Sequence, residues 1–327
     1  MASYIGRRKF LATLGGAAAW PLAARAQQAA KMPRVGLVSA QSRSAPNNAA
    51  FEKRLAELGY QDGKDFIFDF VQVASLEAWE TAFQGLGARK VDIMVAAGPE
   101  IAVKTALATS DTIPIVMIAI DYDPFARGYV TSLARPGGNI TGIFLRQIEL
   151  TVKRLQLVKD AFPDMQAATV FWDRISADQW EAARDASGKL GLRVAGIELR
   201  EQPYDYDRAL AQAAPDYRKN LLVLVSPFFF RDRARLADLA RRNRVTSMFG
   251  FREWVEAGGL LSYGPSIAGM YQRAAEYVDR IAKGAKSTDL PIEQPTKFEL
   301  VVNLKTANAI GIEISTSILL RADEVIE

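Results

Sequence analysis

The 327-residue sequence contains no histidine and no cysteine. Without imidazole and thiolate side chains, the chain cannot bind zinc, copper, haem or an iron–sulfur cluster through their usual ligands. Ser-His-Asp and Cys-His catalytic groups are excluded for the same reason. The remaining possibilities are metals bound by oxygen ligands and chemistry based on carboxylate, lysine or tyrosine side chains. We expect neither a metal nor a cofactor.

The first 26 residues lack acidic side chains, whereas Arg7, Arg8, Lys9 and Arg25 are basic. These four residues account for the whole excess of 41 basic over 37 acidic side chains, and so for the formal charge of +4 and the pI near 9.1. The rest of the chain is formally neutral. A neutral chain gives no reason to expect nucleic acid as a partner.

The same segment has the pattern of a cleaved export signal. Its basic stretch precedes an apolar run at 11–24, which is shorter than the roughly 20 residues that cross a bilayer. Small residues of the A-x-A type follow at 24–26. We therefore expect cleavage after Ala26 and a periplasmic protein that is not embedded in the membrane. The adjacent Arg7 and Arg8 favour the twin-arginine route, with an ordinary Sec signal as the alternative.

From Pro33 onward, short apolar runs alternate with longer amphipathic stretches. This alternation predicts α/β architecture, in which parallel strands are covered by helices on both faces. Strands are expected at 35–38, 66–73, 91–96, 113–120, 167–172, 192–197, 221–225 and 260–263. Helices are expected at 47–58, 76–90, 101–108, 149–161, 177–190, 231–244 and 267–283.

The alternating pattern runs twice, and turn-rich stretches at 135–142, 263–265 and 291–295 divide it. Three crossings of the chain between two doubly wound parallel-sheet lobes would explain all three stretches. In such sheets a ligand binds beyond the carboxyl ends of the strands, where loops lead into helix N-termini. The candidate ligand-binding residues in these loops are Ser39, Gln41, Gly98, Glu100, Tyr122, Asp123, Trp172, Ser226, Phe228, Phe251 and Arg252.

Two acidic candidates allow more than one interpretation. Glu100 opens a predicted helix, where it either pairs with a ligand ammonium or only interacts with the helix dipole. Asp123, together with Asp121, is too small a set for a calcium loop. The preferred interpretation is a turn at Asp123 in which either aspartate accepts a hydrogen bond from the ligand.

Aromatic and basic candidates follow the later strands. Among the three consecutive rings 228–230, we expect Phe228 to face the cleft, with Trp172 as the opposite wall. The alternative is that all three rings pack inside the lobe. Arg252 either holds a ligand carboxylate or forms salt bridges between the lobes.

Four longer stretches resemble a known family: SLARPGGNITG at 132–142, SPFFFRDRARLADLA at 226–240, FREWVEAGGLLSYG at 251–264 and LPIEQPTKFELVVNLKTANAIGI at 290–312. They are similar to the ABC-transporter substrate-binding proteins of the tryptophan/tyrosine-binding type, a branch of the type 1 periplasmic binding proteins. The resemblance covers nearly the whole chain after the export signal.

The resemblance implies two α/β lobes, formed by 33–142 plus 264–292 and by 143–263 plus 293–327. It also implies hinge positions at Asn139, Gly142 and Gly264, around which the cleft closes on one small molecule. The partners would be a membrane permease and its ATPase, and we expect a monomer without enzymatic activity. A sensory module for a periplasmic receptor and, less favoured, a periplasmic cofactor enzyme are the alternatives.

One departure from the family bears on the ligand. Many relatives have a Gly-Gly-Thr-Pro-type loop where this chain has Ala-Gly-Pro-Glu at 97–100, so a hydroxyl is missing and an acid is present. The expected ligand is an aromatic or other apolar amino acid, or a related small carboxylate.

Overall fold

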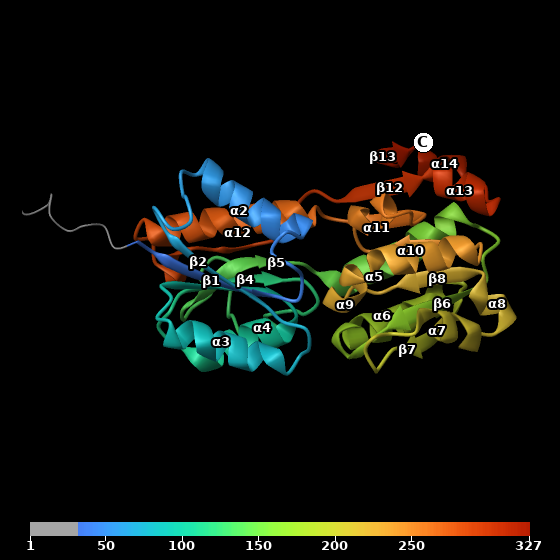
Figure 1. The fold of residues 1–327 in the computed structure, drawn as a ribbon. Helices are drawn as coiled ribbons and strands as arrows, with labels where there is room; N and C mark the ends of the chain where they lie inside the picture. The colour runs from blue at the N-terminus through green and yellow to red at the C-terminus, as the bar shows by residue number, and fades with distance from the viewer. Residues whose placement is uncertain (1–31) are drawn as a thin grey trace, which may run out of the picture.

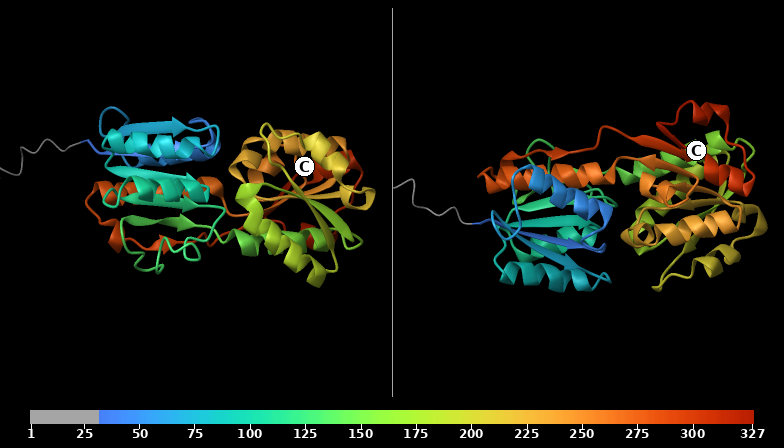
Figure 2. Two further views of the ribbon diagram at one scale, coloured as in Figure 1. Left: turned by 90° about the horizontal axis from the view of Figure 1, so that it is seen from below. Right: turned by 45° about the horizontal axis from the view of Figure 1, so that its top comes forward.

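The computed structural model describes residues 32–327, and the expected export signal lies outside these residues. Two α/β lobes lie side by side and are joined at one side of the molecule (Figure 1). The chain crosses between them three times, as the two further views also show (Figure 2). The expected fold class, two lobes with parallel sheets of the type 1 periplasmic binding protein kind, is confirmed.

The first lobe contains a six-stranded sheet in the order β11-β5-β4-β3-β1-β2, whose neighbouring strands are all parallel. Its strands are β1 (Arg34–Ser39), β2 (Ile67–Gln72), β3 (Ile93–Gly98), β4 (Ile115–Ala119), β5 (Ile140–Phe144) and β11 (Ile292–Glu293). Helices α2 (Pro46–Glu57) and α12 (Ile267–Ala282) cover one face of the sheet, and α3 (Ala78–Ala88) and α4 (Glu100–Thr109) cover the other (Figure 1). The short helix η3 (Ser287–Asp289) precedes β11.

The second lobe contains a seven-stranded sheet in the order β13-β12-β10-β9-β8-β6-β7. Among the strands of residues 32–327, only β12 and β10 pair antiparallel. The strands are β6 (Ala167–Trp172), β7 (Arg193–Glu198), β8 (Asn220–Val223), β9 (Thr246–Phe249), β10 (Leu261–Gly264), β12 (Glu299–Asn303) and β13 (Glu324–Ile326). The helices are α5 (Gln147–Ala161), η1 (Arg174–Ser176), α6 (Ala177–Ser187), η2 (Gly188–Leu190), α7 (Tyr206–Gln212), α8 (Pro215–Arg218), α9 (Pro227–Arg231), α10 (Arg233–Arg242), α11 (Arg252–Glu256), α13 (Leu304–Ile310) and α14 (Thr316–Leu319).

Every strand and helix expected from the alternating pattern is present, with ends shifted by a few residues. The pattern missed β5, because its sequence is embedded in the turn-rich stretch that ends at Gly142. It also missed β9, where Thr246 and Ser247 make a buried strand look polar. The strands β11, β12 and β13 and the short helices α7, α8, α9, α11, α13 and α14 were not expected either. The strands β5 and β9 are held by their neighbours in the sheets, since β5 pairs with β4 and β9 with β8.

The lobes are connected by 145–146, 265–266 and 294–298, which lie between the last strand or helix of one lobe and the first of the other. The first connection therefore lies beyond the expected boundary at Gly142. Asn139 and Gly142 do not lie at a connection: the Asn139 amide holds the carbonyls of Ser110 and Ile113 within the first lobe. Gly142 lies inside β5, whose strand continues to Phe144.

Gly264, the third expected hinge residue, ends β10 directly before the second connection. Its backbone lies so close to the loop after β9 that an added Cβ would come within 2.1 Å of the Gly250 carbonyl oxygen. Gly264 therefore permits a close approach of two backbone segments beside the second connection.

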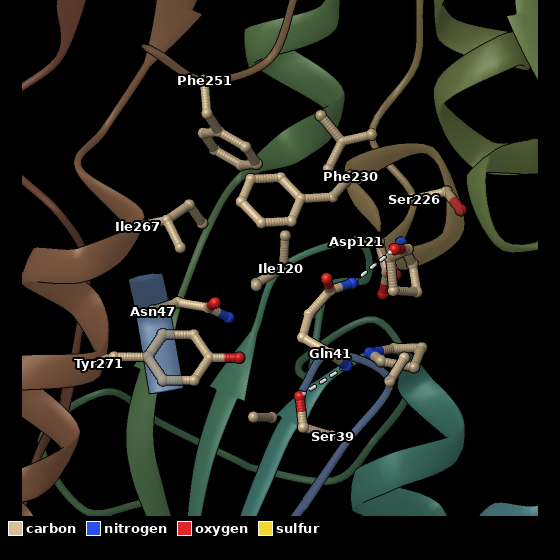
Figure 3. Close-up of a pocket in the computed structure, with 16 residues that line it drawn as sticks. Ser39, Gln41, Asn47, Ile120, Asp121, Ser226, Phe230, Phe251, Ile267 and Tyr271 are labelled. Carbon is tan, nitrogen blue, oxygen red and sulfur yellow. Dashed lines mark hydrogen bonds between the residues drawn. The ribbon is translucent and has the colours of Figure 1, made fainter. Parts of the chain in front are cut away.

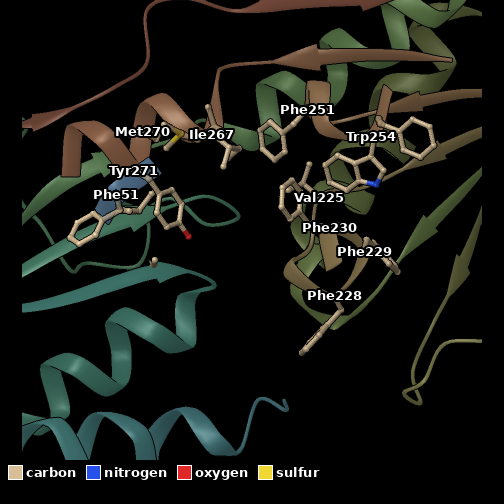
Figure 4. Close-up of a cluster of buried hydrophobic side chains, with 14 of the residues drawn as sticks. Phe51, Val225, Phe228, Phe229, Phe230, Phe251, Trp254, Ile267, Met270 and Tyr271 are labelled. Atoms are coloured by element: carbon tan, nitrogen blue, oxygen red, sulfur yellow. The ribbon is translucent and has the colours of Figure 1, made fainter. Parts of the chain in front are cut away.

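One apolar cluster continues from the first lobe into the second (Figure 4). Phe51 of α2 and Tyr271 of α12 belong to it, and so do Phe230, Phe251 and Trp254 of the second lobe. Burial of this surface stabilises both lobes where they meet. Among residues 32–327, no helix combines the length and the apolar character that a membrane crossing requires.

Candidate functional site

A cavity of about 40 Å³ lies between the lobes, beyond the carboxyl ends of the strands. This volume is the space of a few water molecules. Its lining comes from both lobes, as Figure 3 shows. The lining residues are Ser39, Ala40, Gln41, Asn47, Ala97, Gly98, Pro99, Ile120, Asp121, Val225, Ser226, Pro227, Phe230, Phe251, Ile267 and Tyr271. We call it the cleft cavity.

Two phenylalanine rings form the wall of the cleft cavity on the side of the second lobe (Figure 3). The rings of Phe230 and Phe251 meet edge to face, with centroids 6.3 Å apart, and Trp254 packs behind both. Ile267 and Tyr271 of α12 line the cavity from the first lobe. Apolar rings on one side and a buried helix face on the other suit an apolar or aromatic group.

Polar groups at the end of β1 also line the cavity. The Ser39 hydroxyl accepts hydrogen bonds from the Gln41 backbone at 3.1 Å and from the Asn48 side chain at 3.2 Å. The Gln41 side-chain amide donates across the cleft to the Pro227 carbonyl at 2.8 Å. Asn47, at the start of α2, has a buried side-chain oxygen without a hydrogen-bond partner among the described residues.

Among the described residues, Asp121 is the only one with an ionisable carboxylate that lines the cleft cavity. It follows β4, is 5% exposed, and its Oδ2 has no hydrogen-bond partner among the described residues. Burial raises the pKa of Asp121 well above its usual value, and the charge of Asp173 raises it further, while hydrogen bonds from the backbone of Asp121 and Glu100 partly offset the shift. The Asp121 carboxylate thus accepts a backbone hydrogen bond at the N-terminal end of α4, a position that favours an anion.

Asp173, the acid that raises the pKa of Asp121, belongs to the second lobe and is fully engaged there. Its carboxylate caps η1 and accepts hydrogen bonds from the Ser226 hydroxyl and from the Tyr204 hydroxyl at 3.2 Å. Burial raises its pKa, although these hydrogen bonds favour the charged form. Because Asp173 already has its partners, Asp121 is the acid that remains available to a ligand cation.

Of the remaining candidates of the first lobe, Gly98 lines the cleft cavity. Glu100, Tyr122 and Asp123 lie outside it. Glu100 accepts a hydrogen bond from the Tyr129 hydroxyl at 2.8 Å and pairs with Arg127 at 3.2 Å, and it lines a separate interlobe cavity together with Tyr122. Asp123 accepts hydrogen bonds from the two backbone N–H groups at 125–126. It forms the expected turn, but Asp121 is the aspartate that reaches the cavity.

Three candidates of the second lobe also need correction. Trp172 stacks on Trp180 at 6.1 Å in the core of that lobe, because its position at the end of β6 faces α6. Arg252 forms ion pairs with Glu256, Glu299 and Glu324, so it joins elements of one lobe and does not reach the cavity. Neither side chain lines the cleft cavity.

The third correction concerns the three consecutive rings at the start of α9. Phe230 lines the cavity, whereas Phe228 lies against Tyr204 and under the Arg231 guanidinium. Figure 4 shows Phe230 beside Phe251 and Phe228 directed away from both. The Ser226 cap fixes this turn, since its hydroxyl accepts from the Phe228 backbone at 3.2 Å. The pattern showed that the rings must diverge, but not which of them reaches the cleft.

Arg154 of α5 lies directly behind the Phe251 wall and was not identified from the sequence. It is 1% exposed, and its guanidinium donates to the Tyr263 carbonyl at 2.7 Å, the Gln147 side chain at 2.6 Å and the Gly250 carbonyl at 3.2 Å. Burial without an acidic partner lowers its pKa to about 9. The side chain therefore joins the segments beside two of the lobe connections to the loop that carries Phe251.

Comparison with known proteins assigns this architecture. A family model described as ABC transporter substrate binding protein matches residues 36–326. The chain belongs to this family. As a substrate-binding protein, it is a non-enzymatic, extracytoplasmic component that binds a small molecule for an ABC transporter. The resemblance seen in the sequence is thus confirmed.

Individual relatives of this substrate-binding protein are distant. A tyrosine-binding protein of Clostridioides difficile is 24% identical over 271 residues, which are 80% of this chain and 76% of the relative. Among solved structures, a conserved domain protein of Vibrio cholerae superposes with a TM-score of 0.81 at 20% identity, over 90% of this chain and all of that one. An ABC domain of Streptococcus pneumonia in complex with L-Trp gives 0.76 at 21% identity, with the same coverage.

Proposed function

We propose that this substrate-binding protein captures an aromatic amino acid in the cleft cavity and presents it to an ABC importer. One observation carries the proposal: the carboxylate of Asp121, whose Oδ2 has no hydrogen-bond partner among the described residues, lines the same buried cavity as the rings of Phe230 and Phe251. A ligand ammonium would neutralise the carboxylate, and an aromatic side chain would pack against the two rings. The names of the tyrosine-binding and L-Trp-bound relatives agree with this choice.

The size of the cavity implies that binding requires movement. About 40 Å³ is too little for an aromatic amino acid, so the lobes must part before a ligand enters. The three connections at 145–146, 265–266 and 294–298 are the segments around which such a hinge motion would occur. During opening, the hydrogen bond from the Gln41 side-chain amide to the Pro227 carbonyl would break.

A calorimetric and thermal-shift screen of the twenty amino acids tests the proposal. We expect tyrosine, tryptophan or phenylalanine to raise the melting temperature through mass action and to bind with a defined stoichiometry. Aliphatic amino acids of similar charge serve as controls for the aromatic preference. Stabilisation by none of the amino acids would contradict the proposed function.

We further propose that the chain reaches the periplasm after cleavage behind Ala26 and that Arg7 and Arg8 select the twin-arginine route. The basic, apolar and small-residue order of the first 26 residues supports this. The mass of the exported chain identifies the cleavage point. Replacing both arginines by lysine should abolish export through the twin-arginine route, whereas a Sec signal would tolerate the change.

A further inference from the structure

A second interlobe cavity, of about 230 Å³, adjoins the cleft cavity. The two cavities share Pro99 and Asp121 in their linings. The second cavity is bordered by the start of α4 in the first lobe and by η1 and the start of α6 in the second. Its charged lining residues are Glu100, Lys104, Asp121, Arg127, Arg174 and Asp178.

Three of these charged residues form ion pairs with one another. Arg127 pairs with Glu100 at 3.2 Å and, across the lobes, with Asp178 at 2.6 Å. Lys104 forms no ion pair with any other residue of the described 32–327, and Arg174 has only a longer-range attraction to Glu77. Two cations from opposite lobes therefore remain for an anion in the second cavity.

The cleft cavity, in contrast, is unfavourable for an anion. None of its lining residues is a lysine or arginine, and Asp121 already receives the backbone hydrogen bond at the N-terminal end of α4. The Asp173 carboxylate lies behind Ser226, on the side of the second lobe. A ligand carboxylate placed there would meet the Asp121 carboxylate, with the charge of Asp173 behind the wall, and no lysine or arginine among the lining residues.

We propose that the second cavity is the subsite for the anionic group of the ligand. Lys104 and Arg174 hold a ligand carboxylate from opposite lobes, while Asp121, at the junction of the two cavities, binds the ammonium. The aromatic side chain of the ligand occupies the cleft cavity against Phe230 and Phe251. This assignment rests on the proposed function, and it defines the ligand class as a zwitterion whose two charged groups bind in different compartments.

Because the two charged groups of the ligand bind in different cavities, ligand binding is also coupled to closure of the two lobes. Lys104 belongs to α4 of the first lobe and Arg174 to η1 of the second. An anion between them attracts both lobes, whereas the empty subsite brings two like charges toward each other. A ligand without the carboxylate would fill the cleft cavity but would not favour closure in this way.

Calorimetry with pairs of ligands that differ only in the carboxylate tests the subsite. We choose L-tryptophan with tryptamine, and L-tyrosine with tyramine. Wild-type protein should bind the amino acid at least about tenfold more tightly than its amine. In the Lys104→Met/Arg174→Met double variant, affinity for the amino acid should fall to that for the amine, while amine binding changes less than about twofold. Lys189→Met, an exposed cation on η2, is the control and should leave both affinities unchanged.

The outcomes separate the two proposals. Two results would overturn the anion subsite and leave the proposed function standing. In the first, wild-type protein binds the amino acid and the amine equally. In the second, the double variant still prefers the amino acid. Failure of wild-type protein to bind either member of each pair, together with an amino-acid screen that finds no aromatic ligand, overturns the proposed function, and the subsite with it. The two single variants, each with an exposed side chain replaced, show whether either cation acts alone.

Discussion

Gln41 of the first lobe donates a hydrogen bond of 2.8 Å from its side-chain amide to the backbone carbonyl of Pro227 in the second lobe. A second contact between the lobes, the ion pair of Arg127 with Asp178 at 2.6 Å, lies beside the other interlobe cavity. In the described conformation, the two lobes therefore contact each other beside each of the two cavities.

Gln41→Ala removes the first of these contacts and should weaken ligand binding. A hydrogen bond of this kind contributes about 1 kcal/mol, so the dissociation constant should rise roughly fivefold. Titration calorimetry with the ligand found in the amino-acid screen measures the change. Ser42→Ala, whose exposed hydroxyl faces only Ser44, should leave the affinity as it is. Equal affinity of Gln41→Ala and wild type would show that this contact does not contribute to closure.

Asp121→Asn should stabilise the ligand-free protein, and increasingly so as the pH rises. The folded-state pKa of Asp121 is raised by burial and by the facing acids Asp173 and Glu100, so the folded state holds its proton at pH values where the unfolded state has lost it. Stability from this group is complete below the unfolded-state pKa of about 4 and is lost as the pH rises toward the folded-state pKa. At neutral pH, we expect the unfolding free energy of Asp121→Asn, measured with urea, to exceed that of the wild type by about 1–3 kcal/mol.

The same variant should lose affinity for any ligand with an ammonium group, because the neutral amide offers no charge. Asp123→Asn is the matched control, since that carboxylate faces backbone N–H groups outside the cavity. A variant Asp121→Asn that binds the ligand as tightly as wild type would exclude an ammonium at this carboxylate.

Phe230→Ala and Phe228→Ala form a pair that separates binding from packing. Both rings are buried, so each truncation should cost about 3–5 kcal/mol of unfolding free energy. Only Phe230 lines the cleft cavity, so only its truncation should also weaken ligand binding, by more than about 1 kcal/mol. Urea unfolding and calorimetry on the same samples give the two quantities. Weaker binding in Phe228→Ala alone would restore the original expectation for that ring.

Arg154→Met should destabilise the protein although it removes a buried charge. The Tyr263 and Gly250 carbonyls lose their donor, and each unsatisfied buried acceptor costs about 1–3 kcal/mol. Lys153→Met, on the same helix but partly exposed, should change the unfolding free energy by less than about 0.5 kcal/mol. Wild-type stability in Arg154→Met would mean that relief of charge burial offsets the lost hydrogen bonds.

Gly142→Ala tests the close approach of β5 to β4. The residue has φ +132°, and an added Cβ would come within 2.1 Å of the Met117 carbonyl oxygen. We expect a loss of at least about 3 kcal/mol in urea unfolding, because the sheet must shift to accept the methyl group. Gly188→Ala adds a methyl group where no atom lies within 4 Å, so that variant should be nearly neutral.

The alternation of apolar runs with amphipathic stretches was sufficient to predict the two-lobed α/β fold and most of its elements. This succeeded because buried parallel strands must be continuously apolar and their covering helices amphipathic. The lobe connections were predicted less accurately. Pro136 and the glycines around it indicate a turn, but β5 follows that turn and remains paired in the first sheet.

The sequence by itself determined the chemistry that is absent, the segment that carries the excess positive charge, the family, and the loops among which the site must lie. Only the tertiary structure decided which side chains of those loops share a cavity. The direction of a ring within a short helix such as α9 and the burial of Asp121 depend on contacts between segments far apart in the chain. The spacing of residues along the chain does not determine those contacts. This is why Phe230 takes the position expected for Phe228, and why the sequence could not decide between Asp121 and Asp123.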